Sequence, residues 1–227
     1  MALPKLETPT YETIIPSTGR AIEYRPFLVK EEKILMMAQE TQDTAQAIGA
    51  LKKIISSCTF GKVDPNALTT YDAEFLFLQL RIKSVGESVD FVITDKDTGE
   101  DVNVSVDLSE VEVVEPEVEL EKTIQLNDSI GLTLKDAVGL SGKDMNDITG
   151  LISVVIDTIF DDEKVYNTQD VSKKELEAFI ESLNHSQLEQ ITTFIQNQPA
   201  IQKEIKYRLK DGQEKTITLK GLQDFFV

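Results

Sequence analysis

The sequence predicts an α+β protein, in which an N-terminal β-hairpin plus helices and an acidic β-hairpin are followed by a mostly helical C-terminal part with a terminal hairpin. Three observations indicate this class. Apolar residues alternate in short segments around turn residues near both ends of the chain. Between these segments, apolar residues recur at helical spacing. The chain has 227 residues and a hydrophobic fraction of 41%, which is enough to bury a sizeable core.

A β-hairpin is expected near the N-terminus. Residues 11–15 and 21–25 alternate in the manner of half-buried strands, and Pro16 and Gly19 lie between them. Gly19 can adopt a positive φ without a steric penalty, which suits a turn.

Two helices are expected next. The first begins near Val29 and has apolar residues on one face between residues 34 and 38. The second covers residues 47–55 and ends before Cys58, which we interpret as a small core residue.

The third helix is predicted to lie at the centre of the core. Thr69 and Asp72 have the spacing of a capping box at its start. Residues 75–82 are apolar on nearly all sides, which indicates a helix buried on most of its surface. Gly86 is the predicted stop.

An acidic β segment follows, over residues 87–121. Residues 88–93 and 102–108 alternate as two strands, and the loop 94–99 should join them as a hairpin. Residues 111–114 and 123–126 continue the β character, and the Glu-Pro-Glu at 115–117 between them suits an exposed linker.

The following part is expected to be mainly helical. A long helix is predicted over residues 144–160, with apolar residues on one face. Ser172 with Glu175, and Ser186 with Glu189, have the spacing of capping boxes for two more helices.

The chain should end in a β-hairpin, since Asp211-Gly212 lies between strands at 205–209 and 216–219. We therefore divide the chain into two domains. Residues 1–126 form an α+β domain that includes the acidic β segment, and residues 127–227 form a mainly helical domain that ends in the hairpin.

The charge disfavours several classes of partner. The net charge is −17, and residues 87–121 hold thirteen acids against one base, Lys96. Such a chain should bind neither nucleic acid nor anionic membranes, because phosphates are bound by Lys and Arg. The acidic segment is either a solvated hairpin that keeps the protein soluble, which is the favoured interpretation, or a surface that attracts a basic partner.

Few residues suit catalysis or metal binding. Cys58 and His185 are the only residues of their types. The loop at 95–106 fails the EF-hand register, the Gly-Leu-Ser-Gly-Lys at 139–143 lacks P-loop spacing, and the acids 161–163, which should follow a helix, suit solvent better than a cation. We expect no enzyme, cofactor, metal or small-molecule substrate, although a hydrolase with two convergent carboxylates remains an alternative.

The N-terminal region resembles a known family. The segment Pro-Phe-Leu-Val-Lys-Glu-Glu-Lys at 26–33, preceded by the predicted hairpin, is similar to the opening of the T-even-type bacteriophage baseplate hub family. So is the segment Leu-Thr-Thr-Tyr-Asp-Ala-Glu-Phe-Leu-Phe-Leu-Gln-Leu-Arg-Ile-Lys-Ser-Val-Gly-Glu at 68–87, which is long and unusual. Val-Asp-Leu at 106–108 also fits, and the resemblance covers about residues 1–135.

The resemblance implies a structural or assembly protein of the central baseplate hub of a contractile-tailed bacteriophage. Its partners would be other baseplate or hub proteins. The alternative is a hub assembly chaperone that is absent from the mature virion. The absence of an apolar run of membrane-spanning length and of a signal-peptide pattern suits the host cytoplasm during assembly, and a structural subunit would then reside in the tail baseplate.

Partner binding is assigned to acidic residues and to the aromatic pair near the C-terminus. The pair either docks on the core, which is the favoured interpretation, or contacts a partner. The residues assigned to partner binding are Glu100, Asp101, Glu110, Glu112, Glu115, Glu117, Phe225 and Phe226.

Overall fold

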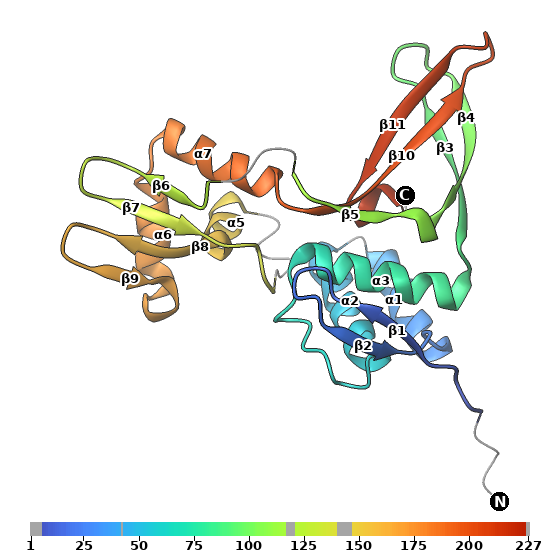
Figure 1. Cartoon of the computed structure of the whole chain (residues 1–227), viewed down its shortest axis with the longest axis horizontal. Coiled ribbons are helices and arrows are strands. Elements are labelled where there is room, and N and C mark those ends of the chain that lie inside the picture. Colours follow the sequence, from blue (N-terminus) through green and yellow to red (C-terminus); the bar gives the residue numbers. More distant parts are fainter. Residues whose placement is uncertain (1–5, 42, 117–120, 140–146, 226–227) are drawn as a thin grey trace, which may run out of the picture.

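A computed structural model describes residues 6–41, 43–116, 121–139 and 147–225. Three parts can be followed in Figure 1. A helical body contains α1, α2, α3 and the hairpin β1–β2. An arm formed by the hairpins β3–β4 and β10–β11 rises from it. A lobe on the opposite side carries the sheet β6–β9 and the helices α5, α6 and α7.

Helices and small antiparallel sheets occupy separate segments of the chain, so the predicted α+β class is confirmed. The described α-helices are α1 (Val29–Thr41), α2 (Thr44–Cys58), α3 (Thr70–Val85), α5 (Ile148–Val155), α6 (Lys173–Glu181) and α7 (His185–Gln196). The described strands are β1 (Tyr11–Ile14), β2 (Ala21–Tyr24), β3 (Ser88–Thr94), β4 (Asp101–Asp107), β5 (Glu112–Val114), β6 (Thr123–Gln125), β7 (Gly131–Leu134), β8 (Ile156–Phe160), β9 (Val165–Asn167), β10 (Ala200–Arg208) and β11 (Glu214–Lys220). Short 3₁₀ turns are η1 (Leu108–Glu110), η2 (Thr168–Asp170) and η3 (Leu222–Phe225).

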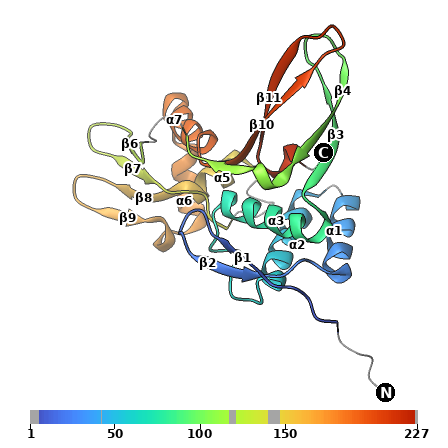
Figure 2. The same cartoon turned by 45° about the vertical axis from the view of Figure 1, so that its right-hand side comes forward.

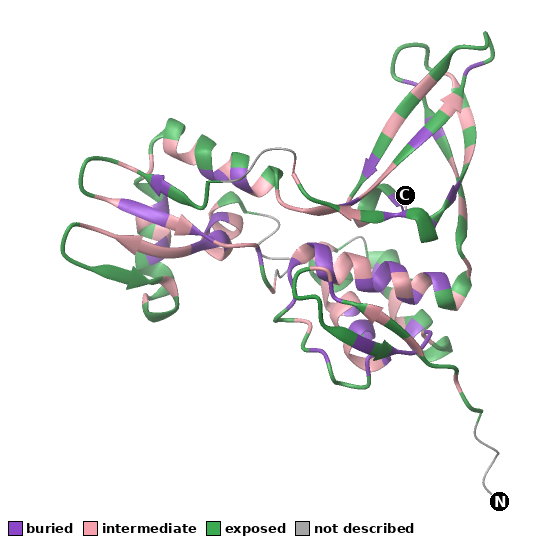
Figure 3. Cartoon of the chain, in the orientation of Figure 1, coloured by how far each residue is buried: buried purple, intermediate pink, exposed green. Residues whose placement is uncertain are grey.

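The helix α3 lies between two parts of the core, as its apolar surface predicts. The capping box of Thr69 and Asp72 is confirmed, and Gly86 ends the helix with a φ of 132°. Phe77 packs in a cluster with α2 and the hairpin β1–β2, whereas Leu78 packs in a cluster at the base of the arm. The apolar residues around α3 therefore serve two packing faces, which Figure 3 shows as buried segments along it.

The arm combines strands from both halves of the chain. The hairpins β3–β4 and β10–β11 are both antiparallel, and both were predicted from local patterns. The strand β10 also pairs with β5, with Ile201 opposite Val113. This pairing joins residues 112–114 to residues 200–202. The division of the chain at residues 126 and 127 remains a prediction, and the described structure distributes its core among three clusters.

The prediction of one helix over residues 144–160 is confirmed for Ile148–Val155 and is wrong from Ile156 onward. The helix α5 ends at Val155, and Ile156 begins β8, which pairs with β7. The residues from Ile152 onward include many β-branched side chains, which suit a strand, and ladder bonds to β7 outweigh the helical spacing. The close packing of β8 depends on Gly131, because a Cβ there would lie 2.3 Å from the Phe160 ring.

Two local predictions in the same lobe had different outcomes. The capping box of Ser172 and Glu175 is confirmed for α6. The box predicted from Ser186 and Glu189 is wrong, because Asn184 and Gln187 form the box of α7 instead. Asn184 ranks among the best N-cap residues, and its use starts the helix two residues earlier. The strands β7 and β9 were not predicted.

Candidate interaction surfaces

The acidic hairpin β3–β4 lies beside a hairpin of the opposite charge. Residues 87–121 hold a large excess of acids, whereas residues 200–220 hold six bases and three acids. The hairpins β3–β4 and β10–β11 rise together from the helical body in both views (Figures 1 and 2). Part of the acidic charge is therefore compensated within the chain itself. The six bases are Lys203, Lys206, Arg208, Lys210, Lys215 and Lys220.

Asp95 is the centre of the contact between the two hairpins. Its carboxylate accepts hydrogen bonds from Lys215 Nζ at 2.8 and 2.9 Å, and from the Tyr207 hydroxyl at 2.8 Å. Within the loop, the backbone N–H and the hydroxyl of Thr98 donate to the same carboxylate, each at 2.9 Å. Asp95 is only 2% exposed, and these donors compensate the loss of its hydration.

These contacts shift three pKa values. The Lys215 ammonium, together with the Tyr207 hydroxyl, holds the pKa of Asp95 well below its usual range. Asp95, followed by Asp97, raises the pKa of Lys215. Hydrogen bonding to Asp95 raises the pKa of Tyr207. Each group therefore keeps the protonation state that the contact requires at neutral pH.

Two of the assigned acids also bind the basic hairpin. Glu110 accepts a hydrogen bond from Lys203 Nζ at 2.7 Å. Glu100 accepts one from the backbone N–H of Lys210 at 3.1 Å, and its carboxylate lies 3.8 Å from Lys210 Nζ. These side chains contribute to the arm itself, so they are less free to meet a partner than the sequence indicates.

The other assigned residues lie in different surroundings. Asp101 accepts a hydrogen bond from the Thr94 hydroxyl across the hairpin, at 2.7 Å. Glu112 and Glu115 are exposed, and no ion pair involves them in the part of the chain that the structure describes. Phe225 is 1% exposed and packs in the cluster at the base of the arm, which agrees with docking on the core. Glu117 and Phe226 lie outside the described residues, and the assignment of partner binding stays a prediction.

Sequence reasoning missed the basic residues of this contact. The sequence predicts no role for Lys215 or for Tyr207, which lies in the strand expected at 205–209. The available signal was the charge, because the net excess of bases at 200–220 is opposite to that of 87–121.

A buried ion pair joins Arg25 to Glu31, which belongs to the segment 26–33 that carries the family resemblance. Arg25 Nη2 donates to Glu31 at 2.9 Å, and the Ser57 hydroxyl donates to the same carboxylate at 2.7 Å. Burial alone would raise the pKa of Glu31, but the hydrogen bonds from Arg25, Ser57 and the Leu28 N–H outweigh it and lower the pKa to about 2. The pair fixes the start of α1 against the end of α2.

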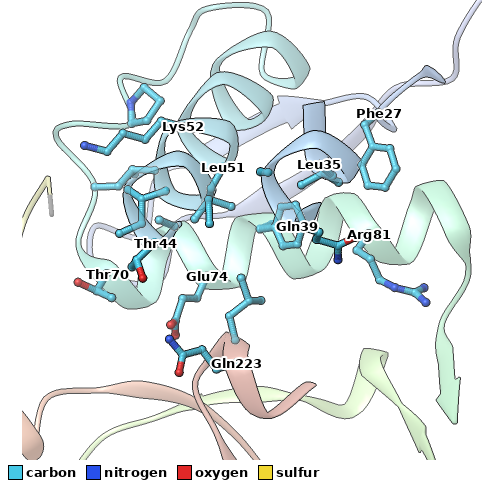
Figure 4. Close-up of a pocket in the computed structure, with 18 of the residues that line it drawn as sticks. Phe27, Leu35, Gln39, Thr44, Leu51, Lys52, Thr70, Glu74, Arg81 and Gln223 are labelled. Atoms are coloured by element: carbon cyan, nitrogen blue, oxygen red, sulfur yellow. The ribbon is translucent and has the colours of Figure 1, made fainter. Parts of the chain in front are cut away.

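An open apolar groove of about 640 Å³ runs along α3 between α1, α2 and η3 (Figure 4). Each helix presents a stripe of residues at helical spacing to it. The stripe of α1 is Glu32, Leu35, Met36 and Gln39. The stripe of α2 is Thr44, Ala47, Ile48, Leu51 and Lys52. The stripe of α3 is Thr70, Ala73, Glu74, Phe77, Arg81 and Val85.

Glu74 is the unusual residue of this groove. Burial raises the pKa of its carboxyl group, although the backbone N–H of Leu222 donates to it. None of the ion pairs among the described residues includes Glu74 or Glu32. By contrast, Lys52 donates to Asn66 at 2.9 Å, and Arg81 donates to the Gly86 carbonyl at 2.5 Å. The bases of the groove already have acceptors, whereas no base in the described ranges forms an ion pair with its acids.

The groups suited to chemistry are dispersed. Cys58 is confirmed as a core residue, since it is fully buried and burial raises its pKa to about 11. His185 is exposed at the first residue of α7. Asp161 lies in the turn between β8 and β9, not after a helix as predicted, and accepts the N–H groups of Glu163 and Lys164. Among the described residues, no three His, Cys, Asp or Glu side chains are grouped to hold a metal ion.

The described helices include none long and apolar enough to cross a membrane. The two candidate interaction surfaces are thus the charged arm and the apolar groove. A comparison with protein families adds the deciding observation: residues 8–227 match the model described as T4 bacteriophage base plate protein. The chain belongs to this family. No curated protein and no solved structure matches the chain.

The family match extends the resemblance seen in the N-terminal region to nearly the whole chain. Both the arm and the groove fall within the matched residues. A protein of this family is a bacteriophage baseplate protein, whose expected contacts are with other baseplate proteins. The two surfaces are accordingly candidates for such contacts.

Proposed function

We propose that the chain is a structural or assembly protein of the central hub of the baseplate in a contractile-tailed bacteriophage. It acts through contacts with other hub proteins, and it catalyses no reaction. The observation that carries the proposal is the match of residues 8–227 to the T4 bacteriophage base plate protein family. The resemblance of the segment at 68–87 to hub proteins supports the more specific place in the hub.

The distribution of the surfaces supports action through contacts. The arm extends from the body and is cross-linked internally by Asp95 and Lys215, so its outer faces can be presented as a rigid unit. Glu112 and Glu115, at the base of the arm, are exposed and can attract a basic partner. In this proposal the chain is made in the host cytoplasm and is incorporated into, or acts on, the tail baseplate there.

Mass spectrometry of purified virions of the source phage tests the proposal. The copy number of this chain should be measured relative to a known baseplate protein. Lysates of infected cells should be fractionated in parallel. A fixed low copy number in virions is expected for a structural hub subunit. Absence from virions, together with association with hub proteins in lysates, would instead support the assembly chaperone. Absence from both the virion and hub complexes would refute the hub role.

A further inference from the structure

The groove along α3 lies between three helices and is wide enough in form to be covered by a fourth. Its three long walls are the stripes of α1, α2 and α3, and apolar side chains such as Leu35, Leu51 and Phe77 line its interior. On α1, Met36 is 57% exposed at the rim. Large apolar side chains at a concave surface mark an interaction site more often than a solvated one.

The chemistry of the walls selects the conformation of the occupant. Backbone groups of α1, α2 and α3 bond within their own helices, so the walls offer few donors or acceptors to an extended chain. An extended segment would leave its own N–H and C=O groups unpaired in apolar surroundings, which is costly. A helix brings its backbone bonds with it and can present anchors at i, i+3, i+4 and i+7.

The charged residues of the groove indicate which charge the occupant should present. Lys52 and Arg81 have acceptors within the chain. Among the residues that the structure describes, Glu74 accepts only the Leu222 N–H and pairs with no cation. Covering the groove would remove the remaining water from the Glu74 carboxylate. A cation from the occupant would compensate that loss, and Glu32 at the rim adds attraction of the same sign.

We propose that this groove receives an amphipathic helix of another baseplate protein, which inserts apolar side chains between α1, α2 and α3 and presents a Lys or Arg to Glu74. The inference rests on the proposed function and specifies the partner's chemistry. The length of α1, whose 13 residues span about 20 Å at 1.5 Å per residue, sets the contact at about three to four turns of helix.

A photo-cross-linking amino acid placed in the groove tests the proposal in infected cells. The full-length chain carries p-benzoylphenylalanine at Met36 or at Ala47, and the matched control carries it at Met37. Met37 is also on α1 and is 67% exposed, but it does not line the groove. Cross-links from Met36 and Ala47, but not from Met37, are expected to one baseplate protein. Mass spectrometry should place them in an amphipathic segment that contains Lys or Arg.

A second variant tests the charge. Glu74→Gln should lower the yield of the groove cross-link by about tenfold, because the partner's cation would be buried without its carboxylate. Glu40→Gln, an exposed acid on α1 outside the groove, should leave the yield unchanged. Equal melting temperatures by circular dichroism for the two variants, to within a few degrees, would show that both are folded.

The outcomes separate this inference from the proposed function. Copurification with hub proteins is scored in the same lysates. If the chain copurifies but Met36 and Ala47 give no cross-link, or cross-link only to this chain or a second copy of it, the groove proposal is overturned while the hub role stands. If cross-links form equally with Glu74→Gln, the charge selection is wrong. Loss of copurification in the unmodified chain would overturn the hub role itself.

Discussion

Lys215 Nζ lies 2.8 Å from one carboxylate oxygen of Asp95 and 2.9 Å from the other, although 120 residues separate the two positions in the chain. The same ammonium group lies 2.7 Å from Asp97. This ion pair joins the loop of the acidic hairpin to the terminal hairpin. It turns two hairpins, each only marginally stable alone, into one arm.

The Asp95–Lys215 pair should stabilise the arm by more than either side chain alone. Asp95→Asn and Lys215→Met are each expected to lower the melting temperature by several degrees, and the double variant by less than the sum. Lys206→Met provides the control, because Lys206 is an exposed base of the same hairpin. Differential scanning calorimetry of the wild type and the four variants measures the coupling. Additive losses would show that the two side chains act independently.

Acid should destabilise the protein through Glu31. Its pKa is about 2 in the folded chain, against 4.5 for the free side chain, so its contribution is complete above about pH 4.5 and is lost as the pH falls toward 2. Urea unfolding of the wild type should show a falling midpoint in this window. Glu31→Gln should be less stable at pH 7 and depend less on pH below 4.5. A parallel pH dependence of the two proteins would contradict the assignment.

Two glycines should respond in opposite ways to alanine. Gly131→Ala places a Cβ 2.3 Å from the Phe160 ring, and should destabilise by about 1–3 kcal/mol through overpacking. Gly49→Ala meets nothing within 4 Å in α2, and should stabilise by about 0.5–1 kcal/mol. Chemical denaturation measures both changes. A neutral effect at residue 131 would mean that the half-buried Phe160 ring moves aside at little cost.

Glu74→Gln should stabilise the isolated chain, although it is expected to weaken partner binding. Burial disfavours the Glu74 carboxylate, as its raised pKa indicates, and an amide accepts the Leu222 N–H without a charge. A rise in melting temperature of roughly 1–3 °C at pH 7 is expected for a chain of this length. The difference should shrink on acidification, because the wild-type carboxyl group is then neutral. A lower melting temperature at pH 7 would show that Glu74 has a favourable partner within the chain.

The exposed acids at the base of the arm should affect binding without affecting stability. Glu112→Lys with Glu115→Lys should weaken association with hub proteins, most strongly at low salt, and leave the melting temperature nearly unchanged. Glu110→Lys is the comparison. Glu110 binds Lys203, so a lysine at position 110 would replace this attraction by repulsion and should destabilise the arm. Copurification from infected cells at two salt concentrations measures the effect. Unchanged association of the double variant at moderate salt would exclude these two acids from the interface.

Elements that depend on neighbouring residues could be predicted from the sequence. The capping box of Thr69 and Asp72 and the terminal hairpin at Asp211-Gly212 are formed by groups within a few residues of each other. The burial of α3 also followed from its own composition. In such cases the energetics are local, so the order of the residues contains the information.

Elements that depend on distant residues could not be predicted. Ile156 leaves the helical pattern because β7 offers it a ladder, and Asn184 displaces Ser186 as the cap of α7. The sequence predicts that the acidic segment at 87–121 is either solvated or bound by a basic partner. In the structure, Lys215, Lys203 and Lys210 of the same chain bind part of its charge. Charge composition indicates that the two segments attract each other, but it does not identify which residues form the contact. Folding brings Asp95 and Lys215 together, and burial then makes that one attraction specific because little water remains to compete for it.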